Sequence, residues 1–401
     1  MRIALITREY PEETGWGGIS TFYHRFAQAL TDAGHEVEVF AQGTTAARTE
    51  RDGNVLVHRF VPRRYFCFDR CGGDLAGMNR HLGLFSVALA WEAARVFAER
   101  QAEAPFDIVE GQEHLGLNAF VNHFPARPYA TVTRYHTAYH TFVNRNLVDW
   151  PASGLIRRLE RMSICSADCR ISASHFIDKA VREDFPGVPA AEEVIPLLMP
   201  LEIGHIDESM RRKTLVFVGR FVPDHKRPHL AAEAFAGLAP EFTDWTIEFA
   251  GPDYPMGDGR TVWQVCESIL DKYPGRYKYH GQLSRERVEN LYLTSSIAVL
   301  PSRFESFGLV ALEALACGCV PVVSDNTAMA EAVGDAGVVF RNGDAEDLKN
   351  KLSLLMSDPE ILAERRKAGY LHAAEVTDTA SLMQRNLDLF DRVIRKKRRE
   401  A

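Results

Sequence analysis

The chain has 401 residues, and this length predicts two domains of about 200 residues each. Its composition, 46% hydrophobic and 25% charged, is typical of a globular protein. The net charge of −7 excludes the strongly basic surface of a nucleic-acid-binding protein, and no apolar run reaches the roughly 20 residues that span a membrane.

Strand and helix patterns alternate through residues 1–200. Helical patterns include Ile19–Ala33, which Gly34 closes, and Phe85–Arg100. Continuous apolar runs are typical of parallel strands that are buried on both faces. Seven strands are expected on this basis: Ile3–Thr7, Glu36–Phe40, Val55–Phe60, Ile108–Gly111, Ala130–Arg134, Arg170–Ser172 and Val194–Leu197.

The N-terminal segment Met1–Ile6 is followed at once by Arg8 and Glu9, so it resembles a buried first strand rather than a signal peptide. A cytoplasmic enzyme is therefore expected, and peripheral attachment to the inner face of a membrane is left open. The seven cysteines of such a chain are expected to be reduced thiols.

A glycine-rich segment, Gly15–Ser20, lies between the first strand and the first helix. It is close to the dinucleotide fingerprint, and Glu36 and Glu38 follow about twenty residues on, so a nucleotide-dependent oxidoreductase is one alternative. Against this, the third glycine is absent and the segment starts too far from the strand for a tight turn. A longer loop fits better, in which Gly17 and Gly18 let the backbone approach a diphosphate or a sugar.

His136 follows the strand Ala130–Arg134 directly, at an end of a parallel strand where ligands bind. His136 and His140 are four residues apart, which is one metal-ligand spacing, but the zincin glutamate and a third ligand are missing. A single histidine at a strand end is often structural, so a functional role for His136 is supported only by the other motifs of the sequence.

The pattern restarts after a polar linker, Leu201–Met210. Strands are expected at Leu215–Gly219, Thr246–Ala250, Tyr277–His280, Ile297–Leu300 and Val320–Ser324, with helices between them. Two alternating units in tandem predict two doubly wound α/β domains across a cleft. The domains are expected at residues 1–200 and 211–375, followed by a C-terminal segment, 376–401, with a helix that could cross back to the first domain.

Two cations follow the first strand of the second domain, in the loop from Gly219 to Lys226. Cations in loops are usually surface charges. Here, however, Arg220 and Lys226 are expected at the carboxyl edge of the sheet, where they would stabilise the charge that develops on a departing diphosphate.

The most specific pattern is the segment Pro301–Glu313, in which a turn leads from an apolar strand into a helix. This helix is expected to begin near Ser306 or Phe307 and to end at Gly318. Free N–H groups and the helix dipole at its start would bind an anion.

Glu305 and Glu313 are separated by about 10 Å along such a helix, the span from a sugar ring across a diphosphate to a ribose. Two surface glutamates would be the simpler interpretation. The helix is apolar nearly all round, however, and a buried Glu313 needs a partner.

Metal binding is not predicted. The cysteine pairs lack the spacing of a zinc site, and the sequence contains no D-x-D motif to hold a divalent ion on a diphosphate. Arg220, Lys226 and a helix dipole would supply the positive charge instead. The basic run Arg395–Arg399 resembles a solvated helix end more than a binding patch.

These motifs together resemble glycosyltransferase family 4, from the glycine loop to Gly318. The spacing of Glu305 and Glu313 resembles the family's E-x7-E motif, in the usual setting S-x-x-E-S-F-G-L-V-x-L-E-A-x-A-x-G. The resemblance implies GT-B architecture, which is two Rossmann-like domains facing a central cleft, with the acceptor in the first and the nucleotide sugar in the second.

The resemblance also implies roles for single residues. Glu305 would contact the transferred sugar, with His136 near it, and Glu313 would contact the ribose. Arg220 and Lys226 would bind the phosphates. Donor contacts are expected from Gly17, Gly18, Ser306, Phe307, Gly308 and Leu309. Acceptor contacts are expected at the loops of the first domain, from Tyr135, Tyr139, His140, Arg145 and Asn146. Two departures stand out, because Arg227 replaces a common glycine and Ile195–Met199 lacks a frequent asparagine.

The implied activity is retaining, metal-independent sugar transfer from a nucleotide sugar, most often a UDP- or GDP-sugar, to a hydroxyl or amine. The acceptor would belong to glycan, glycolipid or natural-product biosynthesis, and small-molecule, glycan and lipid-linked acceptors are left open. No cofactor is expected besides the donor. The alternative is a non-catalytic nucleotide-sugar-binding protein or a partner subunit of a biosynthetic complex. The acceptor is expected to be chosen by residues 63–78 and 139–150.

Overall fold

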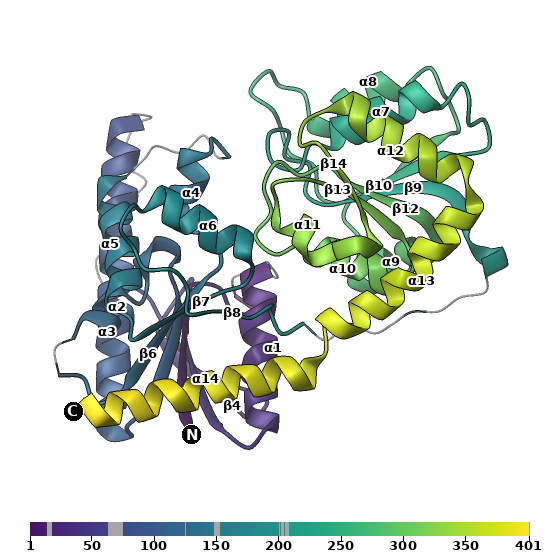
Figure 1. Cartoon of the computed structure of the whole chain (residues 1–401). Coiled ribbons are helices and arrows are strands. Elements are labelled where there is room, and N and C mark those ends of the chain that lie inside the picture. The colour runs from purple at the N-terminus through teal and green to yellow at the C-terminus, as the bar shows by residue number, and fades with distance from the viewer. Residues whose placement is uncertain are drawn as a thin grey trace. The chain divides into compact units, whose positions relative to one another are not determined.

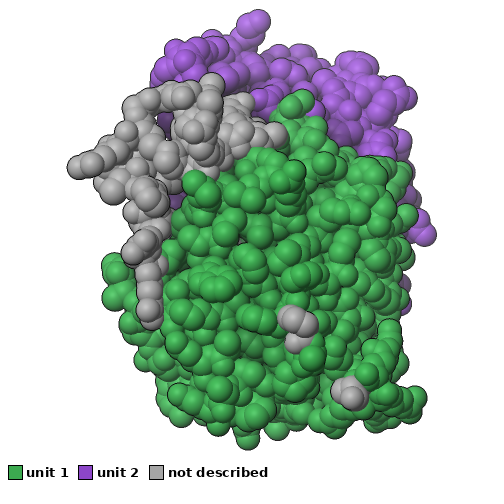
Figure 2. Space-filling view, turned by 90° about the vertical axis from the view of Figure 1, so that its left-hand side faces the viewer, with its two compact units in different colours: residues 1–199, 379–401 green, residues 200–378 purple. Residues whose placement is uncertain are grey.

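The computed structural model describes the whole chain except residues 14–17, 63–74, 125, 148–152, 200, 202–203, 205–207 and 401. The chain forms two compact units: unit 1 is Met1–Met199 with Thr379–Ala401, and unit 2 is Pro200–Asp378 (Figures 1 and 2). Within the described residues, no helix combines the length and hydropathy needed to cross a membrane.

Unit 1 is built on a sheet of eight strands in the order β3-β4-β2-β1-β5-β6-β7-β8. Every neighbouring pair is parallel except β3 and β4. The strands are β1 (Arg2–Thr7), β2 (Glu36–Gln42), β3 (Arg48–Asp52), β4 (Val55–Phe60), β5 (Ile108–Gln112), β6 (Ala130–Tyr135), β7 (Cys169–Ser172) and β8 (Glu193–Val194).

Two strands of unit 1 differ from the sequence prediction. The unexpected β3 is an edge strand of mostly charged residues that pairs antiparallel with β4, so it lacks the apolar run that identified the others. The last strand was expected to reach Leu197 but ends at Val194. Ile195 and Leu197 are still buried, while Pro196 has no N–H to continue the ladder.

The helices of unit 1 come from both ends of the chain. Phe22 and Phe26 of α1 are buried, and the ring of Phe26 lies 6.3 Å from that of Phe390 in α14. The helices are α1 (Gly18–Asp32), α2 (Leu75–Glu103), the 3-10 turn η2 (His114–Gly116), α3 (Ala119–His123), α4 (Tyr139–Asn144), α5 (Gly154–Cys165), α6 (His175–Asp184) and α14 (Thr379–Glu400).

Helix α14 lies along the elements of unit 1 (Figure 1), and a buried ion pair joins it to the sheet. Arg134 on β6 donates to Glu110 on β5 at 2.7 and 3.1 Å, and both side chains are fully buried. The same guanidinium donates to the Asn386 side chain of α14 at 2.6 Å. This network ties a segment about 250 residues away in sequence to the centre of the sheet.

Unit 2 contains six parallel strands in the order β11-β10-β9-β12-β13-β14. They are β9 (Arg212–Val218), β10 (Thr246–Ala250), β11 (Tyr277–Tyr279), β12 (Ser295–Leu300), β13 (Val320–Ser324) and β14 (Val338–Phe340). The sequence analysis did not predict β14, a three-residue strand at the edge of the sheet. The helical elements are η3 (Glu208–Met210), α7 (Pro228–Leu238), α8 (Val262–Leu270), α9 (Arg285–Thr294), α10 (Leu309–Ala316), α11 (Ala328–Val333), η4 (Gly334–Ala336), α12 (Ala345–Ser357) and α13 (Pro359–Val376).

Each sheet reverses its strand order beside its first strand. β1 lies between β2 and β5 in unit 1, and β9 lies between β10 and β12 in unit 2. In open α/β sheets ligands bind at such switch points, beyond the carboxyl ends of the strands. The loops that follow β1, β5, β9 and β12 therefore occupy the positions where a ligand is expected.

The buried ion pair provides a test of this architecture. Arg134→Met is expected to lower the free energy of unfolding by about 3–5 kcal/mol, because it leaves Glu110 buried without its cation. Arg398→Met is the control, since the exposed Arg398 contacts Asp107 at 2.8 Å and such pairs contribute about 1 kcal/mol or less. Urea unfolding measures both, and equal losses would contradict a special role for the buried pair.

Candidate active site

The two predicted cations lie in the loop after β9. Arg220 is exposed, and Lys226 is largely buried. Gly219 lies next to Gly251, whose φ is +142°, and a Cβ on Gly251 would come within 1.9 Å of the Gly219 carbonyl oxygen. Close backbone packing therefore holds the start of this loop against the end of β10.

Arg227 has a φ of +51°, the left-handed conformation that glycine adopts most easily. The sequence carries arginine where glycine is common, and the backbone keeps the conformation that suits glycine. The Arg227 side chain donates to Asn342 at 2.8 Å, and Asn342 in turn donates to the Arg303 carbonyl at 3.0 Å. Asn342, which the sequence analysis missed, follows β14 and joins the loops after β9 and β12.

Helix α10 begins at Leu309, so the expected start at Ser306 or Phe307 was wrong. The reason is Gly308, whose φ of +93° is incompatible with a right-handed helix and makes it the N-cap. A Cβ on Gly308 would lie 2.8 Å from the Met329 side chain, so glycine allows α11 to pack closely. Ser306 and the buried Phe307 thus belong to the preceding turn. The expected end at Gly318 is confirmed by its φ of +68° just past the helix.

Lys226 and Glu305 form an ion pair that joins the two loops at the switch point of unit 2. Burial alone would raise the pKa of Glu305, but the charges of Lys226, His225 and Arg220 hold that pKa below its usual value. Glu305 is therefore ionised at neutral pH. The structure brings together three residues that the sequence placed in one site: Arg220, Lys226 and Glu305.

Glu313 lies inside α10 and is partly buried. Burial raises its pKa, and the charge of Arg285 opposes that shift. Its carboxylate makes no hydrogen bond within the described part of the chain. The hydroxyl of Tyr292 is fully buried and likewise has no hydrogen-bond partner there. The partly exposed carboxylate of Glu313 is thus available to a ligand.

His136 occupies the carboxyl end of β6 in unit 1. Its ring lies 5.3 Å from Phe22 and 5.6 Å from Tyr23, both on α1. Burial, together with the charge of Arg134, holds the pKa of His136 well below its usual value, so the imidazole is neutral. Its Nε2 is buried without a partner among the described residues. The ring can therefore offer a neutral hydrogen bond to a hydroxyl group.

The five expected acceptor residues lie near this turn, and most have contacts within the protein. Tyr139 packs with Leu115 and Ile156 in a small core, and the Tyr135 hydroxyl donates to the Pro189 carbonyl at 3.4 Å. The ring of His140 packs edge-on against Phe185, Arg145 pairs with Glu183 at 2.9 Å, and Asn146 has a φ of +50°.

The glycine loop is only partly described. Gly17 lies outside the described residues, as do residues 63–74 and 148–150 of the expected acceptor segments. Gly18 is the first residue of α1, and a Cβ there would meet no atom within 4 Å. Packing within the described chain does not require glycine at this position.

No cluster of three or more metal-ligating side chains occurs among the described residues. The cysteines that the structure describes, Cys165, Cys169, Cys266, Cys317 and Cys319, are all free thiols.

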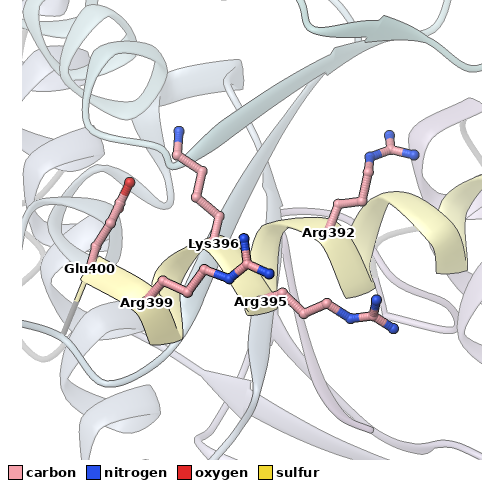
Figure 3. Close-up of a pocket in the computed structure, with 5 residues that line it drawn as sticks. All are labelled: Arg392, Arg395, Lys396, Arg399 and Glu400. Atoms are coloured by element: carbon pink, nitrogen blue, oxygen red, sulfur yellow. The ribbon is translucent and has the colours of Figure 1, made fainter.

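The basic end of α14 borders an open pocket lined by Arg392, Arg395, Lys396, Arg399 and Glu400 (Figure 3). Several charges of this helix have partners in unit 1. Lys397 lies 3.5 Å from Asp168, and Arg392 pairs with Glu193. These contacts fit a solvated helix end that is docked on its own unit.

Both halves of the chain match family models. Residues 16–197 match Glycosyltransferase Family 4, and residues 202–372 match Glycosyl transferases group 1. A D-inositol 3-phosphate glycosyltransferase of Rhodococcus erythropolis is 37% identical over 378 residues, 89% of this chain and 82% of the relative. A glycogen synthase of Mycobacterium tuberculosis is 24% identical over 386 residues, 92% of this chain and 89% of the relative.

The fold has a close counterpart in the sucrose-phosphate synthase of Thermosynechococcus elongatus. The TM-score is 0.76 at 19% sequence identity, covering 98% of this chain and 99% of the other. Two Rossmann-like units with these matches define a glycosyltransferase of GT-B type. The chain belongs to glycosyltransferase family 4.

Two buried carboxylates of unit 1 were missed by the sequence analysis, Glu113 after β5 and Glu160 on α5. Both are fully buried, and burial raises the pKa of each from 4.5 to about 8. Glu113 could have been suspected from its place directly after a parallel strand. Glu160 lies in the middle of a helix and offers no such signal.

These pKa values predict a pH dependence of stability. A carboxyl group whose pKa is raised by folding makes its full contribution to stability at pH values below its unfolded pKa. That contribution is lost as the pH rises toward the folded pKa of about 8. The free energy of unfolding should therefore fall by on the order of 1 kcal/mol per pH unit between pH 5 and 8 for each such group. Glu160→Gln should remove the part of this pH dependence that comes from Glu160. Urea unfolding between pH 5 and 8 tests this prediction. If the free energy of unfolding fell equally with pH in the wild type and in Glu160→Gln, the raised pKa of Glu160 would be contradicted.

Proposed function

We propose that this glycosyltransferase moves a sugar from a nucleoside diphosphate sugar, most often a UDP- or GDP-sugar, to a hydroxyl or amine, with retention of anomeric configuration and without a metal ion. The observation that carries the proposal is the Lys226–Glu305 pair at the switch point of unit 2, close to Arg220.

The donor would bind at the carboxyl edge of the sheet in unit 2. The N–H groups of Leu309 and Val310 at the start of α10 would face the diphosphate, helped by the helix dipole. Glu313 would hold the ribose hydroxyls, and its unpaired carboxylate suits this role. Glu305 would contact the transferred sugar. Ser306, Phe307 and Gly308 form the turn between these groups, while Gly17 and Gly18 would contribute from unit 1.

The chemistry requires stabilisation of a leaving diphosphate. As the bond from the anomeric carbon to the diphosphate oxygen breaks, negative charge grows on that group. Arg220 and Lys226 would stabilise this charge more strongly in the transition state than in the bound substrate. Two cations and a helix dipole supply the charge that a divalent ion supplies in other enzymes.

Retention would follow from attack on the face that the diphosphate leaves. The acceptor hydroxyl forms the new bond to the anomeric carbon, and its proton passes to the departing diphosphate. The neutral His136 would hydrogen-bond a sugar hydroxyl through its free Nε2.

The acceptor would bind to unit 1, near the turn that follows β6, where Tyr135, Tyr139, His140, Arg145 and Asn146 are the candidates. The Rhodococcus relative is named for D-inositol 3-phosphate, which is a phosphorylated polyol, and this favours a hydroxyl group as the acceptor. A lipid-linked acceptor at a membrane surface would change the acceptor but not the chemistry. The remaining alternative, a non-catalytic nucleotide-sugar-binding protein, would bind the donor without turnover.

Donor binding is tested by thermal shift with UDP-, GDP-, ADP- and dTDP-sugars in the presence of EDTA. A ligand at 100 times its Kd stabilises the folded state by about 2.7 kcal/mol, which corresponds to a rise in Tm of roughly 5–10 °C for a unit of this size. We expect this rise with one nucleotide class and its loss in Glu313→Ala. Glu286→Ala, an exposed glutamate of unit 2, should keep it. If no nucleotide shifts Tm, the donor site is wrong.

The stereochemistry is tested with the donor identified in that panel. Proton NMR of the product mixture is expected to show the anomeric configuration of the donor. Lys226→Ala should lower kcat by about 100-fold or more, because it removes transition-state charge stabilisation. An inverted product would overturn the retaining mechanism, and donor binding without any turnover would favour the non-catalytic alternative.

A further inference from the structure

Two buried carboxylates hold the turn that carries His136. The backbone N–H of His136 donates to both oxygens of Glu113, at 2.9 and 3.0 Å. The N–H groups of Tyr139 and His140 donate to the two oxygens of Glu160, at 2.6 and 3.1 Å. The residues from 136 to 140 are thus bound at both ends by side chains from other elements.

Glu160 also holds the turn after β5. Oε1 of Glu160 accepts the N–H of Leu115 at 3.0 Å, and Leu115 has a φ of +57°, which is strained for a branched side chain. At Gly116, a Cβ would come within 2.5 Å of the backbone of Leu159 on α5. The turn after β5, the turn after β6 and α5 therefore meet in one tightly packed junction.

The burial of these two carboxyl groups is unfavourable for the stability of the fold. Glu113 and Glu160 are fully buried, and within the described part of the chain neither has an ion-pair partner. A buried carboxylate without a cation destabilises a fold unless hydrogen bonds compensate. Here the compensation comes from backbone N–H groups of the two turns. Backbone strain and two buried acidic side chains without a cation partner, at one ligand-binding edge of a sheet, point to function.

The side chain of His136 shows what the junction achieves. Its backbone is fixed by Glu113, its ring packs against Phe22 and Tyr23, and its Nε2 is left without a partner in the described chain. The ring is thus held in one place while one nitrogen stays available.

We propose that Glu113 and Glu160 are positioning residues, which act on sugar transfer by fixing the 136–140 turn and hence the imidazole of His136. The inference rests on the proposed function, because it assumes that His136 contacts a reacting sugar. A displacement of about 1 Å in such a group can lower a rate by 100-fold.

Above the pKa of about 8, where both carboxyls are ionised, the variants Glu113→Gln and Glu160→Gln keep the shape of the side chain but replace one acceptor oxygen with a donor. That amide nitrogen faces a backbone N–H, of His136 or of His140, so the turn must shift. The matched control is Glu38→Gln. Glu38 is a similarly buried glutamate of unit 1, but it lies on β2, where it pairs with His58 at 2.7 Å and Arg100 at 2.9 Å.

We expect Glu113→Gln and Glu160→Gln each to lower kcat by at least about 10-fold, while the Kd of the donor nucleotide changes less than about twofold. Glu38→Gln should lower stability and leave kcat per folded molecule unchanged. In a His136→Ala background, Glu160→Gln should change kcat by less than about threefold, because two residues that act through one group are not additive. Additive losses, or an unchanged kcat in the single variants, would overturn the proposal.

A second readout does not need turnover. The imidazole nitrogen resonances of His136, assigned with His136→Ala, should shift in both glutamine variants and stay in place in Glu38→Gln. Unmoved resonances would overturn the positioning role even if the protein proved to be a non-catalytic binder. Failure of the proposed function is recognised separately, since wild-type protein would then bind or turn over no nucleotide sugar.

Discussion

Parallel strand order decides where every functional loop of this protein lies. A parallel sheet with right-handed crossovers gathers the loops that follow its strands at one edge. In unit 2, β9 lies between β10 and β12, so the loop with Lys226 meets the loop with Glu305. In unit 1, β1 lies beside β5, which is followed by β6, so Glu113 reaches the turn of His136. Residues 20 to 80 positions apart in sequence become neighbours for this reason.

The pKa values of buried carboxyl groups are shifted in opposite directions in the two units. In unit 2 the cation of Lys226 holds the pKa of Glu305 low and keeps it ionised, which suits the proposed contact with the transferred sugar. In unit 1 Glu113 and Glu160 have only backbone N–H groups, so burial dominates and raises the pKa of each to about 8. The first arrangement suits interaction with a ligand, and the second suits the fixing of a turn.

One departure from the family pattern, at Arg227, is accommodated by local contacts. Arg227 keeps the left-handed backbone that glycine would adopt, and Asn342 binds its side chain. The strain of such a residue costs on the order of 1 kcal/mol or more. The contact with Asn342 also joins the loops after β9 and β12, so the arginine adds a link that glycine would lack. Gly308 shows the opposite case, in which the close approach of Met329 leaves no room for a side chain.

The sequence by itself determined the two alternating α/β halves, most of the strands, and the association of Glu305 with Arg220 and Lys226. Apolar runs of five or six residues and polar residues at their carboxyl ends are local signals, so they can be read without a structure. Short or charged edge strands such as β14 and β3 lack that signal. The start of α10 depended on the conformation of Gly308, which the packing of α11 decides. Only the tertiary structure showed that Glu160, on a helix, reaches the backbone of a turn some twenty residues earlier, because no periodic pattern records which backbone groups a buried carboxylate will meet.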